Sequence, residues 1–193
     1  MLRFRLLAAL AGALFAGLSV ATIAAARISD DDGAPPAYVY TFGAGDFGPA
    51  CWQTHSGPFC APFDYSFRLL GIRPGAGSPW GIFERRNNDT GGVFRGRVTC
   101  MTVEGNHASI GGILTATPGQ PGIVDGDPFI IYVEDNGPVG SPTRDQISVL
   151  AILPANDPDR PLMPERFPEV CPSADSLYGY APLTSGDITV ADA

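Results

Sequence analysis

CMTVEGNHASIGGIL, residues 100 to 114, predicts two β-strands joined by a tight turn. Gly105-Asn106 is a two-residue hairpin signal, because both residues tolerate the positive φ that the favoured hairpin turns require. Side chains alternate between the two faces of a strand. The second strand therefore places one row of residues on a single face, namely Ala108, Ile110, Gly112 and Leu114.

The flanking residues extend this hairpin and define its faces. Phe94, Val98 and Cys100 share one parity in the preceding strand, so we expect them to lie together on its buried face. His107 falls at the first position of the second strand, on the opposite parity from the row that ends at Leu114, and is expected to face solvent. Gly111-Gly112 indicates a bulge or a close approach of backbone at mid-strand.

Short β-type runs alternate with Gly, Pro, Asn and Asp clusters along the rest of the chain, and no segment has the periodicity of a three-turn amphipathic helix. The expected strands span residues 37–42, 64–70, 92–103, 107–117, 129–134, 146–153 and 187–192. Their spacing predicts one antiparallel all-β domain over residues 37–193, a β-barrel or β-sandwich of about seven strands. Residues 154–172 contain six prolines and are expected to form a long loop.

The first 26 residues have the features of an export signal. Arg3 and Arg5 precede an uncharged run over residues 6–26, which ends in Ala24-Ala25-Ala26. This order is typical of a signal peptide that is cleaved after its last small residue. An uncleaved membrane anchor is the alternative, because 21 uncharged residues are enough to span a bilayer. Residues 27–36, RISDDDGAPP, are expected to form a disordered lead-in.

The charge balance disfavours several classes of partner. The chain of 193 residues has a formal net charge of −8, which becomes −10 when Arg3 and Arg5 are removed with the signal. Such an acidic balance disfavours nucleic acid and anionic membrane surfaces as partners. Cleavage would leave no stable membrane anchor, so we expect a secreted, periplasmic or cell-envelope protein. With nucleic acid and anionic membranes disfavoured, a small molecule or a protein remains as the expected kind of ligand.

Four cysteines follow the expected cleavage site, namely Cys51, Cys60, Cys100 and Cys171. An even number in an exported chain predicts two disulfides, for which three pairings are possible. The Ser-Gly-Pro turn within CWQTHSGPFC, residues 51–60, favours pairing of its two ends. Cys171 would then pair with Cys100 and anchor the proline-rich loop. The cysteine spacings do not match those of a zinc site.

The sequence contains no recognisable catalytic motif. It lacks the GxSxG of serine hydrolases and the HExxH of zinc hydrolases. Its two histidines are His55 and His107, and His55 lies beside Ser56 inside the expected disulfide loop. Neighbouring positions in a sequence do not produce the geometry of a catalytic triad. We therefore expect no catalytic residue and no cofactor.

Acidic turns supply the one candidate metal site. Four residues flank the strand expected at 129–134 and could offer oxygen ligands to calcium, namely Asp125, Asp127, Asp135 and Asp145. Aspartate is also an ordinary turn residue, because its side chain hydrogen-bonds the local backbone. We prefer this second interpretation and expect no metal site.

Aromatic side chains are concentrated in the N-terminal half of the domain, namely Tyr38, Tyr40, Phe42, Trp52, Phe63, Tyr65 and Trp80. They could line the ligand-binding mouth of a barrel. We expect them instead to fill the core, because aromatic side chains bury large apolar areas there.

Residues 95–112, RGRVTCMTVEGNHASIGG, resemble a segment shared by a group of exported bacterial proteins, as do VEDNG (133–137), DQIS (145–148), CP (171–172) and SGDITVADA (185–193). The shared pattern is roughly GxVTCxxVxGNxAxIGG, followed by DNG, DxIS, CP and a terminal strand. The resemblance covers about the last 100 residues and implies a small exported β-domain in which Cys100 and Cys171 pair. It implies no activity, since members of this group are generally uncharacterised. The chain departs from the pattern at His107, where arginine is usual, and by having Cys51 and Cys60.

Together these features predict an exported, disulfide-stapled β-domain that is not an enzyme and that binds a ligand or associates with the cell envelope. The alternative is a hydrolase or isomerase on a β-barrel, with an acidic, calcium-supported site. The two functions differ in geometry. An enzyme should have a deep pocket where His55 or His107 meets a carboxylate, whereas a binding or structural module should show scattered histidines and a shallow surface.

Overall fold

The structure is a computed structural model that describes residues 38–54, 57–116, 123–175 and 178–192, without the side chains of residues 52–54 and 116. The expected signal, its lead-in and the His55-Ser56 pair lie outside the described residues. Within them, strands dominate and the one helical element is the 3₁₀ turn η1 (Arg160–Leu162). No helix in this part of the chain has the length and apolar character needed to cross a membrane. The all-β prediction is confirmed.

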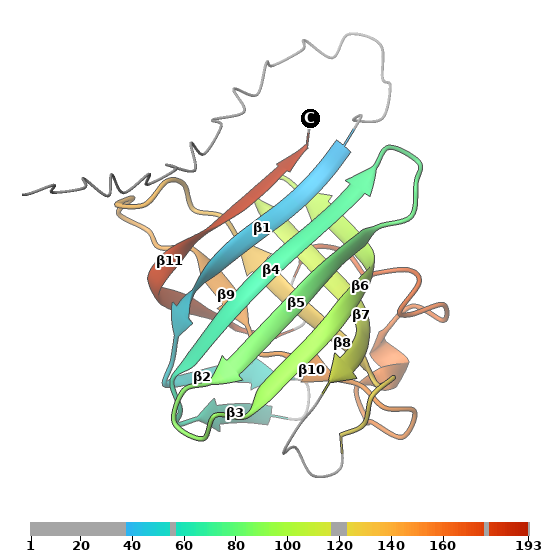
Figure 1. Cartoon of the computed structure of the whole chain (residues 1–193), viewed down its shortest axis with the longest axis horizontal. Coiled ribbons are helices and arrows are strands. Elements are labelled where there is room, and N and C mark those ends of the chain that lie inside the picture. Colours follow the sequence, from blue (N-terminus) through green and yellow to red (C-terminus); the bar gives the residue numbers. More distant parts are fainter. Residues whose placement is uncertain (1–37, 55–56, 117–122, 176–177, 193) are drawn as a thin grey trace, which may run out of the picture.

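Eight antiparallel strands form a closed β-barrel (Figure 1). In barrel order they are β1 (Tyr38–Phe47), β4 (Tyr65–Pro74), β5 (Trp80–Asn87), β6 (Val93–Glu104), β7 (His107–Ala116), β8 (Pro128–Glu134), β9 (Gln146–Ser148) and β11 (Tyr180–Asp192). Each strand pairs with the next one in this order, and the last strand, β11, pairs with β1. The topology is therefore up-and-down. The fold is thus a barrel and not a sandwich.

Three further strands lie outside this cycle. β2 (Ala50–Thr54) and β3 (Gly57–Ala61) form a separate hairpin at one end of the barrel (Figure 1). β10 (Ala151–Ile152) pairs with β8. The single strand expected at 146–153 is therefore split into β9 and β10. The hydroxyl of Ser148 accepts a hydrogen bond from the Tyr132 N–H at this break, at 2.9 Å.

The expected hairpin at Gly105-Asn106 is confirmed. β6 ends at Glu104, β7 begins at His107, and Gly105 has a φ of +63°. Asn106 also joins the turn to the end of β8. Its side-chain amide donates to the Asp135 carbonyl at 2.8 Å, and its own carbonyl accepts from the Asp135 N–H at 2.9 Å.

The expectation that Cys100 shares a face with Val98 is wrong. Val98 pairs with Gly112 and Cys100 pairs with Gly111, so Thr99 is an extra residue in β6. A β-bulge of this kind interrupts the alternation of side chains between the two faces. Val98 consequently belongs to the core inside the barrel, whereas Cys100 is buried on the outer side.

Apolar side chains fill the interior of the barrel. Its largest fully buried members include Phe47, Phe83, Phe129, Ile110 and Leu114. The rings of Phe83 and Phe129 stack with their centroids 5.5 Å apart. The ring of Phe129 lies against Gly96 and Gly112. It fits there because neither glycine has a Cβ, which would collide with the ring. The interior is therefore a packed core.

A second apolar core lies on the outer side of β6, β7 and β8. The proline-rich loop, residues 154–172, packs there and brings Met163 and Phe167 against Ile130 and Tyr132. Figure 1 shows this loop, in orange, along the side of the barrel. Hydroxyl groups of β6 and β7 hold it in place. Thr99 donates to the Pro168 carbonyl at 2.6 Å, and Ser109 to the Pro172 carbonyl at 2.8 Å.

Both disulfides have the expected pairing. The first joins directly opposed residues of the β2–β3 hairpin, Cys51 and Cys60, whose side chains are exposed. The second joins Cys100 of β6 to Cys171 at the end of the proline-rich loop and is part of the outer core. The two bonds therefore have different roles, one local and one between distant segments.

Gly111 and Gly112 of β7 allow the two cores to approach each other. Gly112 faces the interior, beside Phe129. Gly111 faces outward, where a Cβ would lie 2.7 Å from the sulfur of Cys100 and 2.8 Å from the ring of Phe167. The close backbone approach that the sequence indicated thus occurs on both sides of the strand.

Gly112→Ala should lower the free energy of unfolding by about 1–3 kcal/mol, because the new methyl group must displace Phe129 or the facing Arg97 carbonyl in a filled core. Thr115→Ala, at an exposed position of the same strand, is the matched control and should change it by less than about 0.5 kcal/mol. Chemical denaturation measures both. Equal effects of the two substitutions would contradict this description of the core.

Loss of the Cys100–Cys171 disulfide should cost more stability than loss of Cys51–Cys60. The first closes a sequence separation of 71 residues and the second one of 9. Chain entropy alone then gives about 4 kcal/mol against about 3 kcal/mol, and the longer link also holds the proline-rich loop on the outer core. Thermal unfolding of the two double-alanine variants compares them. A larger loss for the Cys51→Ala, Cys60→Ala variant would argue against this ranking.

Candidate functional site

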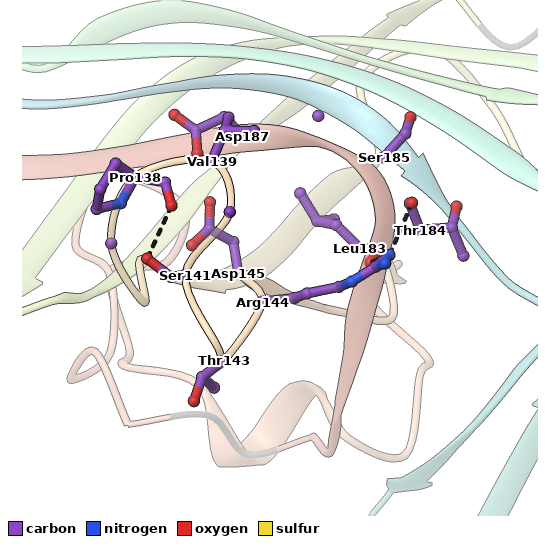
Figure 2. Close-up of a pocket in the computed structure, with 13 residues that line it drawn as sticks. Pro138, Val139, Ser141, Thr143, Arg144, Asp145, Leu183, Thr184, Ser185 and Asp187 are labelled. Carbon is purple, nitrogen blue, oxygen red and sulfur yellow. Dashed lines mark hydrogen bonds between the residues drawn. The ribbon is translucent and has the colours of Figure 1, made fainter.

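A polar groove of about 270 Å³ lies between the β8–β9 loop and the first half of β11 (Figure 2). Loop residues 137–145 form one wall, and β11 residues 183–187 form the other. Figure 2 shows the Arg144 side chain reaching across to β11. Its guanidinium donates to the carbonyls of Leu183 and Thr184, at 3.0 and 2.7 Å. The arginine therefore joins the two walls.

Asp145 joins the same two segments from below the surface. Asp145 is buried, with 5% of its surface exposed. One carboxylate oxygen accepts from the Asn136 N–H at 2.8 Å, and the other from the Ile188 N–H at 2.7 Å. Both oxygens of this carboxylate thus serve the backbone of the loop and of β11.

Asp135 makes an equivalent bridge at the start of the loop. Its carboxylate accepts from the Gly137 N–H at 2.8 Å and from the Val190 N–H at 3.0 Å. Two aspartates that the sequence places in turns therefore also anchor a loop to a strand about 50 residues away in sequence, and this long-range role is not visible in the local pattern.

The four calcium candidates do not converge on one site. Asp125 and Asp127 precede β8, whereas Asp135 and Asp145 follow it at the other end of the strand. Asp127 accepts from the Val124 N–H at 2.9 Å, within its own turn. Among the described residues, no group of three His, Cys, Asp or Glu side chains is arranged to hold a metal ion.

Asp187 lines the groove beside Asp145 and titrates differently from an ordinary aspartate. Partial burial raises the pKa of Asp187, and the charge and hydrogen bond of Asp145 raise it further. The folded protein consequently holds a proton on Asp187 at a higher pH than the unfolded chain does. This carboxylate therefore opposes folding at neutral pH, and the opposition disappears as the pH falls through its raised pKa.

Asp187→Asn should raise the unfolding temperature at neutral pH, because the amide removes the repulsion with Asp145. The gain should fade as the pH falls through the raised pKa of Asp187, because the parent carboxyl then becomes protonated. Asp145→Asn is the contrasting variant and should lower stability by about 1–3 kcal/mol, since one backbone N–H loses its acceptor. Thermal unfolding across this pH range measures both. A lower unfolding temperature for Asp187→Asn at neutral pH would refute the proposed repulsion.

His107 meets a carboxylate on the outer surface of the barrel. Its Nε2 lies 3.4 Å from Glu134 Oε1, its Nδ1 lies 3.9 Å from Asp175 Oδ1, and its side chain is 31% exposed. Gln146 donates to the other oxygen of Glu134 at 2.8 Å. The histidine is therefore only partly solvent-facing, and its contacts join β7, β8 and β9.

Within the described residues, the neighbours of this histidine–carboxylate pair give no support to a catalytic role. General-base catalysis needs a nucleophile or a water within reach and a pocket that holds the substrate. The serines of the next row are engaged elsewhere, because Ser109 donates to the Pro172 carbonyl and Ser148 to the Val149 carbonyl. The groove of Figure 2 does not contain His107. The arrangement acts as a polar link between strands.

Arg85 is a site that the sequence analysis missed. It follows Phe83 on the inward parity of β5, and its guanidinium lies between the rings of Tyr65 and Phe94, 4.8 and 4.9 Å from their centroids. Its Nε is buried without a hydrogen-bond partner, and no described carboxylate pairs with it. Burial lowers the pKa of Arg85 to about 10, so the side chain stays charged at neutral pH. Two cation–π contacts therefore compensate for the burial of this charge.

Arg85→Lys should destabilise the protein by about 1–2 kcal/mol, because an ammonium group is more strongly hydrated and cannot lie flat against two rings. Arg85→Met keeps a long apolar side chain and removes the buried charge, so it should cost less than the lysine variant. Denaturant titration compares the three proteins. A lysine variant as stable as the parent would show that the stacked geometry is unimportant.

No protein-family model, no curated protein and no solved structure matches this chain. The residues on which the resemblance to exported proteins was based nonetheless have clear contacts, and these contacts are structural. Most of them hold a turn, a disulfide or a segment junction, namely Thr99, Cys100, Asn106, Gly111, Gly112, Asp135, Asn136, Asp145, Ser148 and Cys171. The pattern thus describes how this half of the barrel is assembled.

The outer surface of β1, β4 and β5 is the remaining candidate, and it is apolar. Cross-strand pairing aligns Phe42, Leu70 and Ile82 in one row and Tyr40, Ile72 and Trp80 in the next. Tyr38 extends this surface at the end of β1. Figure 1 shows that no described segment covers these strands from outside. We call these seven residues the aromatic face.

The aromatic face corrects an expectation from the sequence. Tyr38, Phe42 and Trp80 are 54%, 48% and 54% exposed, so the prediction that they fill the core is wrong. Phe63 is also exposed, and Tyr65 is the member of the predicted set that lies in the core. The exposed aromatics of β1 and β5 occupy the outward parity of their strands, where a closed barrel offers no partner layer.

Proposed function

We propose that this protein is an exported binding module without catalytic activity, which associates with the cell envelope through the aromatic face. The main observation that supports this proposal is the exposure of the aromatic face, in which Ile82 is 63% exposed and Trp80 is 54% exposed. Apolar patches of this kind are unfavourable in water and usually mark interaction surfaces.

Export is supported by two independent features. The N-terminal 26 residues have the order of a signal peptide. Both pairs of cysteines are disulfide-bonded, and such bonds persist in oxidising compartments outside the cytoplasm.

Binding on the outside is favoured over binding within the barrel. The side chains of the interior core pack against one another, as Phe83 and Phe129 illustrate. The polar groups of the groove in Figure 2 already bond to the protein backbone. Among the described residues, neither place has a set of polar groups that converges on a ligand.

A hydrolase or isomerase is the second candidate function, and the pair of His107 and Glu134 is the observation that favours it. Such an enzyme would depend on the histidine as its acid or base. His107→Ala removes that group and leaves the aromatic face unchanged, so it separates the two functions.

The proposal predicts that Trp80→Ser with Ile82→Ser releases the exported protein from the envelope fraction of its host cell, because both side chains are central to the aromatic face. His107→Ala should stay in that fraction. Fractionation followed by immunoblotting measures the distribution, and circular dichroism verifies that each variant is folded. Retention of the double variant, or turnover of a hydrolase substrate that His107→Ala abolishes, would overturn the proposed function.

A further inference from the structure

The arginines of this acidic chain gather beside the aromatic face. Four of them point outward from neighbouring strands and are exposed, namely Arg68 of β4, Arg86 of β5, and Arg95 and Arg97 of β6. On β4, β5 and β6 the rows that contain them hold one carboxylate, Glu84, which lies 2.7 Å from Arg95. On β1 the row of Arg86 also contains Asp46, whose carboxylate accepts a hydrogen bond from the Ser185 hydroxyl at 2.6 Å. This part of the surface is therefore cationic although the whole chain is anionic.

The strand pairing places these arginines along the border of the apolar rows. Arg97 continues the row of Ile82 across β6. Arg68 and Arg95 occupy the two ends of the next row, and Arg86 lies one row further toward the β2–β3 hairpin. The cationic border thus follows two sides of the aromatic face.

The net charge of −8 does not decide what this face attracts. Charges separated by more than the Debye length, about 8–10 Å at physiological salt, are largely screened from each other. The carboxylates of Asp135 and Asp145 lie on the β8–β9 side of the barrel and bond to backbone N–H groups there. The total charge of the chain alone therefore does not exclude an anionic membrane as the partner of this face.

The composition of the face matches that of membrane-interface surfaces. Tryptophan and tyrosine are enriched at the level of the lipid headgroups, where an apolar ring and a polar group both find suitable surroundings. Arginine binds phosphate oxygens through parallel N–H donors. Apolar burial combined with attraction to anionic headgroups is the usual basis of peripheral membrane binding.

A second copy of the chain is a poorer match for the same surface. A symmetric dimer through this face would bring both cationic borders into one interface, where like charges repel. An anionic lipid surface instead supplies the opposite charge and an apolar layer together.

We propose that the aromatic face and its arginine border bind peripherally to an anionic lipid bilayer. This inference rests on the proposed function and names its partner. Trp80 and Ile82 enter the headgroup region, and Arg68 and Arg97 contact lipid phosphates at its edge.

The test uses the protein as its host exports it, with the N-terminus identified by mass spectrometry. Flotation measures binding to vesicles of phosphatidylcholine, with and without phosphatidylglycerol. The parent should bind the anionic vesicles and lose binding as salt is raised. Trp80→Ser with Ile82→Ser, and separately Arg68→Gln with Arg97→Gln, should each weaken binding by about tenfold or more. Val124→Ser with Val139→Ser, at positions 61% and 78% exposed in loops outside the face, is the matched control and should bind like the parent.

A second measurement does not depend on the folding of a polar variant. Brominated acyl chains should quench the tryptophan fluorescence of the parent, and Trp80→Phe should remove that quenching. No binding to either vesicle, equal binding to both, or equal weakening by the control pair would overturn the inference. Envelope association in cells that depends on Trp80 and Ile82, without vesicle binding, would leave the proposed function standing and point to a protein partner. A dimer that the Trp80→Ser, Ile82→Ser variant dissociates would assign the face to self-association and also overturn the inference.

Discussion

The absence of side chains at Gly111 and Gly112 is the constraint on which the rest of this structure depends. One glycine lets Phe129 fill the barrel, and the other lets the Cys100–Cys171 disulfide and Phe167 pack against the outside of the same strand. β7 therefore has a core on each side. The neighbouring strand β8 is also buried on both faces, since all five residues from 129 to 133 have zero exposure. The inner and outer cores consequently stabilise the same two strands.

This two-sided burial divides the molecule into halves with different properties. The half built from β6 to β9 is covered by the proline-rich loop and is joined by buried aspartates and hydroxyl groups. In the part of the chain that the structure describes, the half built from β1, β4 and β5 has no such cover and exposes the aromatic face (Figure 1). The carboxylates of Asp135 and Asp145 lie in the first half, whereas Arg68 and Arg86 point outward from the second. A surface that combines apolar rows with a cationic border thus arises on a chain whose total charge is negative.

Local signals predicted the fold better than the site. The hairpin at Gly105-Asn106 and the two disulfides were correct, because turn chemistry and cysteine spacing act over short or covalently limited distances. The three strands β2, β3 and β5 were missed. β5 contains Arg85 on its inward side, which breaks the alternation expected of a strand, and its stabilisation by Tyr65 and Phe94 is a tertiary effect.

The remaining errors also have tertiary causes. The bulge at Thr99 moved Cys100 to the outer face, and no local pattern distinguishes it from a regular strand. Barrel closure left Tyr38, Phe42 and Trp80 on an outward surface without a second layer, so residues suited to a core are exposed. The partners of Asp135 and Asp145 on β11 lie about 50 residues away in sequence, which placed their anchoring role beyond the reach of turn rules.

Native-state amide hydrogen exchange tests the central claim, that β7 and β8 are stabilised by cores on both sides. If the claim is correct, the amides of residues 108–112 and 130–133 exchange most slowly, at a rate set by global unfolding. Amides of β1 and β11, which have a core on one side, exchange faster through local opening. Slower exchange in β1 and β11 than in β7 and β8 would contradict the claim.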